Sequence, residues 1–323
     1  MSVNDEVLEG QETPKTRWKI AHVLCPVDFS DISQHALDHA AAIARWYEAR
    51  LTLLYVFPNF PVIDVPSLVL GEPDREGLMA GMRGMAAAVP REVPVDFRIE
   101  EAPYVHNEIL AQLGTTHADL LVIGTHGRSG FQRLFLGSVT EKVIRKTTCP
   151  TLVVPPRAPD VPAGSPIQCR RILCAVDFSE SSLDAVALAI NMAQEADAKL
   201  TLLHVVEFSP VLSEAPLMPA PDLSRVREAA AADARRKLHA LIPESARTYC
   251  TVETAVVEGR AYRDILRHAT EGQSNLIVMG VHGRGALDLL VFGSTTHHVI
   301  RASACPVLIV RPAHADRTGS PQS

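Results

Sequence analysis

Gly124-Thr125-His126-Gly127, nine further residues and then Gly137-Ser138 form the stretch that decides the fold. The apolar run 120–123 precedes it and predicts a buried strand, and the segment after it predicts a helix. Between a strand and a helix, glycines let backbone N–H groups approach an anion, and the start of the helix offers unpaired donors. The stretch therefore predicts a phosphate-binding loop in an α/β protein.

The same pattern recurs as Gly280-Val281-His282-Gly283, nine residues and Gly293-Ser294. Other segments repeat with it: VLCPVDFS at 23–30 matches ILCAVDFS at 172–179, and VIRKTTCP at 143–150 matches VIRASACP at 299–306. The offset is 149 residues between Asp28 and Asp177, and 156 between Gly127 and Gly283. A period of this length is the size of a whole domain and too long for a solenoid repeat.

Two similar domains are therefore predicted, and we call them the first copy (19–156) and the second copy (170–312). A disordered lead over 1–18, a proline-rich linker over 157–169 and a loose tail over 313–323 complete the expected layout. Strands are expected at 20–27, 51–57, 93–100, 120–124 and 151–154, and again at 171–177, 200–206, 249–257, 275–280 and 307–310. Helices are expected between most of them.

Alternation of strands and helices, with strands that are continuous Val, Ile and Leu runs, predicts parallel sheets covered on both faces. Right-handed crossovers make each a doubly wound α/β domain. A ligand of such a sheet lies at the carboxyl ends of the strands, where the strand order reverses. Asp28 and Gly124 both lie at the ends of predicted strands, so they flank one crevice if those strands are neighbours.

One region differs between the copies. Residues 222–242 predict a good amphipathic helix, whereas 72–89 carry Gly77, Gly81 and Gly84. Each glycine costs about 1 kcal/mol relative to alanine inside a helix. We expect this element to be looser in the first copy, as a mobile cover over the site or as a poor helix held by packing.

Composition excludes several classes of protein. The chain is 47% hydrophobic and 21% charged, with a net charge of −6, so it has no basic footprint for nucleic acid. No apolar stretch approaches the roughly 18 residues of a membrane helix, and residues 1–15 lack the features of a signal peptide. These observations predict a cytoplasmic protein with neither nucleic acid nor membrane as partner.

Neither the cysteines nor the histidine pair at 297–298 form a recognisable set of metal ligands. The six cysteines show no CxxC spacing, so we interpret them as reduced, mostly buried thiols rather than zinc ligands. Cys250 is expected inside a strand. Neighbouring residues of a helix do not face the same way, so His297-His298 is interpreted as a solvated helix face rather than a chelating pair.

The Val-Asp-Phe-Ser strand end, the G-x2-G-x9-G-S loop and the closing Cys-Pro-x-Leu-x-Val strand together resemble the universal stress protein (UspA) family. The resemblance covers nearly all of both copies. It implies a five-stranded parallel sheet of order 3-2-1-4-5 in each copy and binding of ATP, with Mg²⁺ or Mn²⁺ held mainly by the phosphates. It also implies pairing through the last strands, between the two copies as a pseudo-dimer or between two chains as a homodimer.

Site residues follow from the resemblance position by position. Adenine and ribose of the first site would contact Pro26, Asp28 and Val56, and its phosphates would contact Gly124, Thr125, His126, Gly127, Arg128, Ser129, Gly137, Ser138, Val139 and Thr140. The second site would use Asp177, Val205, Gly280, Val281, His282, Gly283, Arg284, Gly285, Gly293, Ser294, Thr295 and Thr296. Ala175 replaces Pro26 there, which weakens the adenine side.

Each role has a physical basis and an alternative. A carboxylate at a strand end can accept hydrogen bonds from ribose hydroxyls, and Ser138 and Ser294 can donate to phosphate and cap the helix that follows. Asp28 could instead serve only as a charge at the start of a helix, and the glycines only as a tight connection. His126 and His282 are interpreted as backbone contacts rather than acid–base catalysts.

The implied function is a nucleotide-dependent stress-response regulator with an unidentified protein partner. The alternatives are a slow ATPase or autophosphorylating enzyme, and a structural adaptor without nucleotide. No Walker lysine, kinase aspartate or general base is evident, so no catalytic residue is assigned. The first site should bind triphosphate more tightly, because Asp288 and Leu289 replace Gln132 and Arg133 in the second loop.

Overall fold

The computed structural model describes residues 19–59, 74–127, 136–162, 169–207, 220–281 and 293–312, without side chains for 220–223. The predicted lead and tail, and the site residues Arg128, Ser129, His282, Gly283, Arg284 and Gly285, lie outside these ranges. The first copy contains β1 (His22–Pro26), α1 (Asp31–Trp46), β2 (Arg50–Pro58), α2 (Arg75–Met85), a 3₁₀ turn (Ala86–Ala88), β3 (Val95–Ala102), α3 (Val105–Thr116), β4 (Leu120–Gly124), α4 (Ser138–Lys146) and β5 (Thr151–Val154).

The second copy repeats this order. It contains β6 (Arg171–Ala175), α5 (Glu180–Ala196), β7 (Lys199–Val206), α7 (Ala220–Ala240), α8 (Glu244–Tyr249), β8 (Thr251–Glu258), α9 (Ala261–Glu271), β9 (Leu276–Gly280), α10 (Ser294–Ala302) and β10 (Val307–Val310). In the described ranges, none of these helices combines the length and apolarity needed to cross a bilayer.

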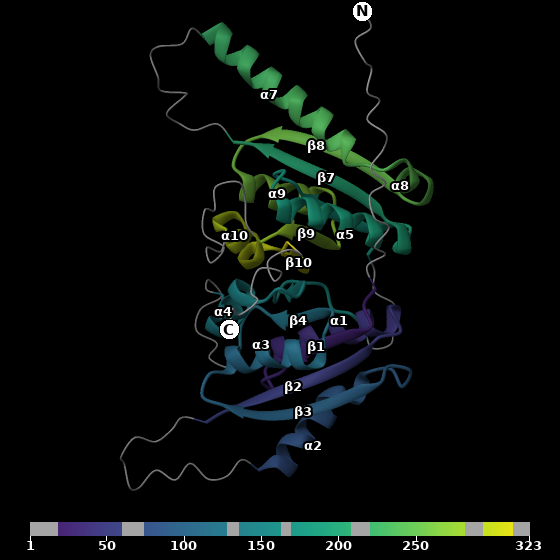
Figure 1. Ribbon diagram of the computed structural model, residues 1–323, viewed down its shortest axis with the longest axis vertical. Coiled ribbons are helices and arrows are strands. Elements are labelled where there is room, and N and C mark those ends of the chain that lie inside the picture. The colour runs from purple at the N-terminus through teal and green to yellow at the C-terminus, as the bar shows by residue number, and fades with distance from the viewer. Residues whose placement is uncertain are drawn as a thin grey trace, which may run out of the picture.

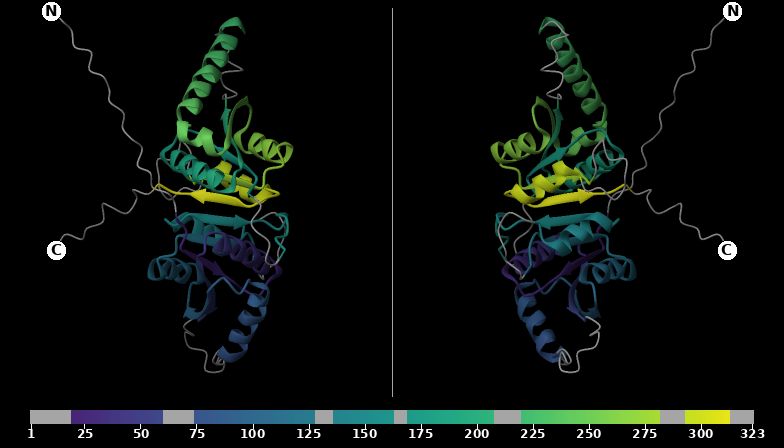
Figure 2. Two further views of the ribbon diagram at one scale, coloured as in Figure 1. Left: turned by 90° about the vertical axis from the view of Figure 1, so that its right-hand side faces the viewer. Right: turned by 90° about the vertical axis from the view of Figure 1, so that its left-hand side faces the viewer.

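All ten strands form one sheet, in the order β3-β2-β1-β4-β5-β10-β9-β6-β7-β8 (Figure 1). The order 3-2-1-4-5 predicted for each copy is confirmed, and all pairs within a copy are parallel. β5 and β10 pair antiparallel at the centre, with Leu152 opposite Leu308, and Figure 2 shows the two strands side by side.

The pairing of last strands is therefore made inside the chain. β5 has β4 and β10 as neighbours, and β10 has β9 and β5, so neither strand offers a free edge. Both hydrogen-bonding sides of each strand are occupied within the chain, and the further homodimer expected through these strands stays a prediction.

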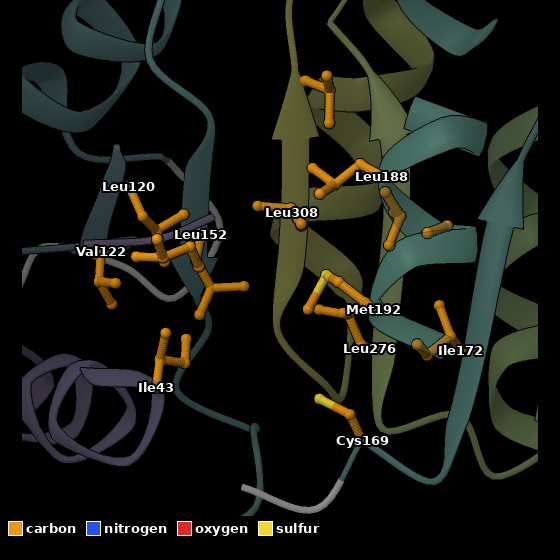
Figure 3. Packing of buried hydrophobic residues seen from close by; sticks show 14 of the residues in the cluster. Ile43, Leu120, Val122, Leu152, Cys169, Ile172, Leu188, Met192, Leu276 and Leu308 are labelled. Atoms are coloured by element: carbon orange, nitrogen blue, oxygen red, sulfur yellow. The ribbon is translucent and has the colours of Figure 1, made fainter. Parts of the chain in front are cut away.

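Two apolar clusters cover the two faces of the sheet. One includes side chains of α1 and α5, and the other includes side chains of α3, α4, α9 and α10. Each cluster contains residues from both copies, and Figure 3 shows Leu152 of β5 and Leu308 of β10 within the first. The copies consequently share their cores, which resists separation of the two halves.

The region between the second and third strands differs between copies, as expected. α7 is a long helix, and the first copy has the shorter α2. Met82 of α2 is fully buried, which supports a helix held by packing. The strand expected at 249–257 begins only at Thr251, because the unpredicted α8 starts after Pro243, and Cys250 is the residue after that helix rather than a strand residue.

Candidate functional site

β1 and β4 lie side by side, as the prediction for the ligand position requires. Val23 of β1 pairs with Leu120 of β4, and α1 and α4 begin just beyond the carboxyl ends of these strands. β1 continues the sheet toward β2, and β4 continues it toward β5, so the strand order reverses between them. This is the position at which doubly wound sheets bind ligands. β6 and β9 give the same arrangement in the second copy.

Asp28 is held in a fixed geometry at the start of α1. Its Oδ1 accepts hydrogen bonds from the backbone N–H (3.1 Å) and hydroxyl (2.6 Å) of Ser30. Ser30 is the N-cap of α1, and its Oγ accepts from the N–H of Ser33. The alternative role of Asp28, as a charge at the helix start, is thus part of the structure. Its other oxygen, Oδ2, lies so close to Gly127 that a Cβ built there would be 2.6 Å away.

The second copy reproduces this carboxylate. Asp177 Oδ1 accepts from the N–H (3.0 Å) and hydroxyl (2.5 Å) of Ser179, which caps α5. Two carboxylates are therefore positioned alike at two equivalent strand ends.

A strained backbone follows each carboxylate. Phe29 and Phe178 have φ values of 63° and 64°, in the left-handed region that a phenylalanine rarely adopts. Such a conformation costs about 1–3 kcal/mol and persists where surrounding contacts impose it. The Phe29 ring packs 5.0 Å from that of Tyr55, and the Phe178 ring 4.7 Å from that of His204. The sequence gives no signal of this strain, since phenylalanine is not a residue typical of that conformation.

The second copy places a histidine where the first has Tyr55. The Nδ1–H of His204 donates to the carbonyl of Val176 at 2.6 Å. The Lys237 ammonium also lies 5.9 Å from the centre of the Phe178 ring. The surroundings of the second strained phenylalanine are therefore more polar, which distinguishes the two sites within the described residues.

The two ends of each glycine loop are joined by a backbone hydrogen bond. The N–H of Gly137 donates to the carbonyl of Thr125 at 2.7 Å, and in the second copy Gly293 donates to Val281 at 3.3 Å. The Thr140 hydroxyl donates to the carbonyl of Gly124 at 2.8 Å and is buried, and Thr296 does the same to Gly280 at 3.2 Å. These threonine hydroxyls fasten the helix to the strand end, so they are already used as donors within the chain.

The start of α4 offers donors to the crevice. Glu141 donates to the carbonyl of Gly137, and the N–H groups of Ser138, Val139 and Thr140 precede this first helical bond. The predicted capping role of Ser138 and Ser294 is wrong. Each is the first residue inside its helix, and the N-cap is Gly137 or Gly293, which has no side chain to cap with.

The two residues that follow β4, Thr125 and His126, carry polar side chains. The Thr125 hydroxyl is 2.9 Å from His126 Nδ1. His126 Nε2 is buried and has no hydrogen-bond partner among the described residues. A buried polar atom of this kind fits a site that a polar ligand completes.

The conspicuous glycines divide into two roles. A Cβ at Gly124 would lie 2.6 Å from a side-chain carbon of Ile32, and one at Gly280 would lie 2.8 Å from the backbone of Ser181. These two glycines let α1 and α5 pack closely on β4 and β9, which gives them a packing role beside the one predicted for them. Gly127 instead allows the chain to approach the Asp28 carboxylate.

The residues expected at the base and sugar end lie at adjacent strand ends. Pro26 and Ala175 end β1 and β6, and Val56 and Val205 lie near the ends of β2 and β7. Val56 is buried and pairs with Glu100 of β3. The sequence did not indicate that α2 packs against Phe29, where a Cβ at Gly81 would lie 2.9 Å from the ring.

Comparison with known proteins identifies the family. The universal stress protein family matches residues 19–155 and again 168–311. A universal stress protein of Methanocaldococcus jannaschii, MJ0531, is 34% identical over 140 residues, covering 41% of this chain and 80% of its own. The crystal structure of a functionally unknown protein from Pseudomonas aeruginosa aligns with a TM-score of 0.64 at 19% identity, over 92% of this chain and 94% of that one.

A universal stress protein solved in complex with cAMP is also similar, at 23% identity and a TM-score of 0.34, over 42% of this chain and 97% of its own. Because the family match extends over both copies, the class of protein is settled: the chain is built from two α/β universal stress protein domains in tandem. This protein belongs to the universal stress protein family.

Proposed function

We propose that the chain binds an adenine nucleotide, ATP with Mg²⁺ or Mn²⁺, at the carboxyl ends of β1 and β4 and of β6 and β9. The observation that carries the proposal is the constellation around Asp28. A carboxylate fixed by its cap serine faces Gly127, and the three leading N–H groups of α4 precede the first helical bond. A carboxylate suits sugar hydroxyls, and a helix start suits phosphates.

Different residues would contact different parts of the nucleotide. Pro26, Asp28 and Val56 would hold adenine and ribose, as would Asp177 and Val205 in the second copy. The loop from Gly124 through Ser129 and the helix start at Gly137 to Thr140 would hold the phosphates. Their second-copy counterparts are Gly280 through Gly285 and Gly293 to Thr296. The divalent cation would be held mainly by the phosphates and would neutralise their charge.

Within this proposal the bound nucleotide sets a conformation that an unidentified partner protein recognises during stress. Residues 157–169 would act as the connector between the two domains. The shared core across β5 and β10 supports such a role, because a change at one site can be passed to the other through continuous packing.

Calorimetric titration of nucleotide-stripped protein with ATP and Mg²⁺ tests the proposal. Saturable binding of two nucleotides per chain is the expected result, and one per chain would restrict the function to a single copy. Absence of binding would overturn the proposal and favour the adaptor. A parallel titration with cAMP establishes which nucleotide is preferred. Turnover above about 1 s⁻¹, the lower end of typical enzymes, would favour the enzyme alternative.

A further inference from the structure

A cluster of ligand-forming side chains lies away from the candidate nucleotide sites, between α1 and the segment that follows β5. His35, Asp38 and His39 occupy positions i, i+3 and i+4 of α1, so they share one helix face. The rings of the two histidines lie 5.1 Å apart. His35 Nε2 is 3.4 Å from the carbonyl of Pro159 and 3.7 Å from Asp160 Oδ1.

His39 is unusual for a buried residue. Its exposed fraction is 4%, and neither ring nitrogen makes a hydrogen bond of good geometry within the ranges that the structure describes, although the Pro159 backbone lies near the ring. The matching residue of the second copy is Leu188, which is equally buried and packs in the core shown in Figure 3. A leucine therefore satisfies the packing at this position, whereas an imidazole whose nitrogens are poorly hydrogen-bonded is costly to bury. The burial of this imidazole therefore favours a bound ligand at His39.

We propose that His35 and His39 bind one divalent transition-metal ion of the zinc class, with the carboxylate of Asp160 as third ligand. Histidines at i and i+4 on one helix face form a recurring pair of zinc ligands, and a carboxylate is a common companion. As the side chains stand, no three such groups among the described residues converge on one point. Asp160 completes the set by turning inward, which costs no packing because its side chain is fully exposed.

The ion would fasten the connector between the copies. Residues 155–162 follow β5 and lead toward β6, and Ala158 within them is buried and donates its N–H to Pro155. A metal joining α1 to Asp160 would hold this segment against the first copy. The second copy has Asp184, Ala187 and Leu188 at the three helix positions, so it lacks both histidines.

Cobalt titration of the full chain without nucleotide tests the site. Co²⁺ reports its ligands by visible absorption, and we expect one equivalent bound through nitrogen and oxygen, without a thiolate charge-transfer band, and displaced by Zn²⁺. His39→Leu copies the second copy, so it should fold, as circular dichroism would verify, and lose this binding. Asp160→Asn should weaken binding at least about tenfold. His106→Gln, on α3, is the control that should keep full binding.

Three results would overturn the proposal: no saturable equivalent in the unaltered chain, unchanged affinity in His39→Leu, or a thiolate band that assigns the ion to cysteines. Should His39→Leu fail to fold, His35→Gln gives the same test at a partly exposed position. Unchanged affinity in that variant would count equally against the site.

Discussion

Single residues decide how closely two strand ends approach each other. Gly127 brings the glycine loop against the Asp28 carboxylate, where a Cβ would sit 2.6 Å from Oδ2. Van der Waals contact between such atoms needs well over 3 Å, so a side chain here displaces the carboxylate that Ser30 holds. Gly127 thus permits the turn of the glycine loop and also leaves room for the Asp28 carboxylate, the group that we assign to the sugar.

Gly127→Ala should weaken ATP binding to the first site about tenfold, because it moves a carboxylate that would accept hydrogen bonds from the ribose. Gly114→Ala is the matched control, since a Cβ at Gly114 in α3 meets nothing within 4 Å. Calorimetric titration of both variants measures the effect. Equal affinities for the two variants would contradict the assigned role of Gly127.

His22 ties three parts of the first copy together. Its ring nitrogens are 2.9 Å from the carbonyl of Thr116 and 2.8 Å from the hydroxyl of Thr52, and its backbone N–H donates to Asp119. Burial lowers the pKa of His22, against a smaller raising effect of the Thr116 carbonyl. The buried ring is therefore neutral at neutral pH.

The pH dependence of stability follows from this lowered pKa. As the pH falls below about 6.5, the unfolded chain takes up a proton at His22 before the folded chain does, so folding stability decreases. His22→Gln should remove this contribution and make the loss of stability between pH 7 and 5.5 smaller. Urea unfolding of both proteins at the two pH values measures it. An identical loss in the variant would show that His22 does not contribute.

At the scale of elements, periodicity and turn residues predicted most of the fold. The apolar runs located all ten strands, and Asp28 and Gly124 with their counterparts in the second copy marked the strand ends that lie side by side. The boundary before β8 was missed because α8 is only six residues long and shows no usable period. The capping glycines and the left-handed Phe29 were missed because they depend on backbone angles that tertiary contacts impose.

In the glycine-rich α2, packing overrides helix propensity. Substitutions at two of its glycines should have different effects on stability. A Cβ at Gly84 meets nothing within 4 Å, so Gly84→Ala should stabilise the protein by up to about 1 kcal/mol. A Cβ at Gly81 would lie 2.9 Å from the Phe29 ring, so Gly81→Ala should gain less or destabilise. Thermal unfolding compares the two variants, and equal gains would mean that α2 does not press on Phe29.

At the scale of the whole molecule, the two copies are joined by a short antiparallel pairing and by a shared core. Among the described residues, three pairs join β5 and β10, from Thr151–Ile309 to Val153–Val307, and both apolar clusters continue across them. The chain thus makes the contact between the two last strands internally. Its two sites are held at a fixed distance, independent of protein concentration.

Arg311 adds hydrogen bonds across this junction. It follows β10, and its Nη2 donates to the carbonyls of Ile144, at 3.1 Å, and Arg145 in the last turn of α4. A cation at the carboxyl end of a helix also complements the helix dipole. Arg311→Ala should lower the free energy of unfolding by about 1.5–3 kcal/mol, because it removes a half-buried charged donor from the two carbonyls.

The loss should also be local to the junction. Hydrogen exchange should quicken at the amides of β5 and β10 and stay unchanged in β2 and β7, which lie away from the junction. Arg157→Ala removes an exposed arginine from the segment after β5 and serves as the control, with no expected change. If Arg311→Ala left the exchange of β5 and β10 unaltered, the shared core alone would hold the two copies together, and Arg311 would be a surface residue without a role in joining them.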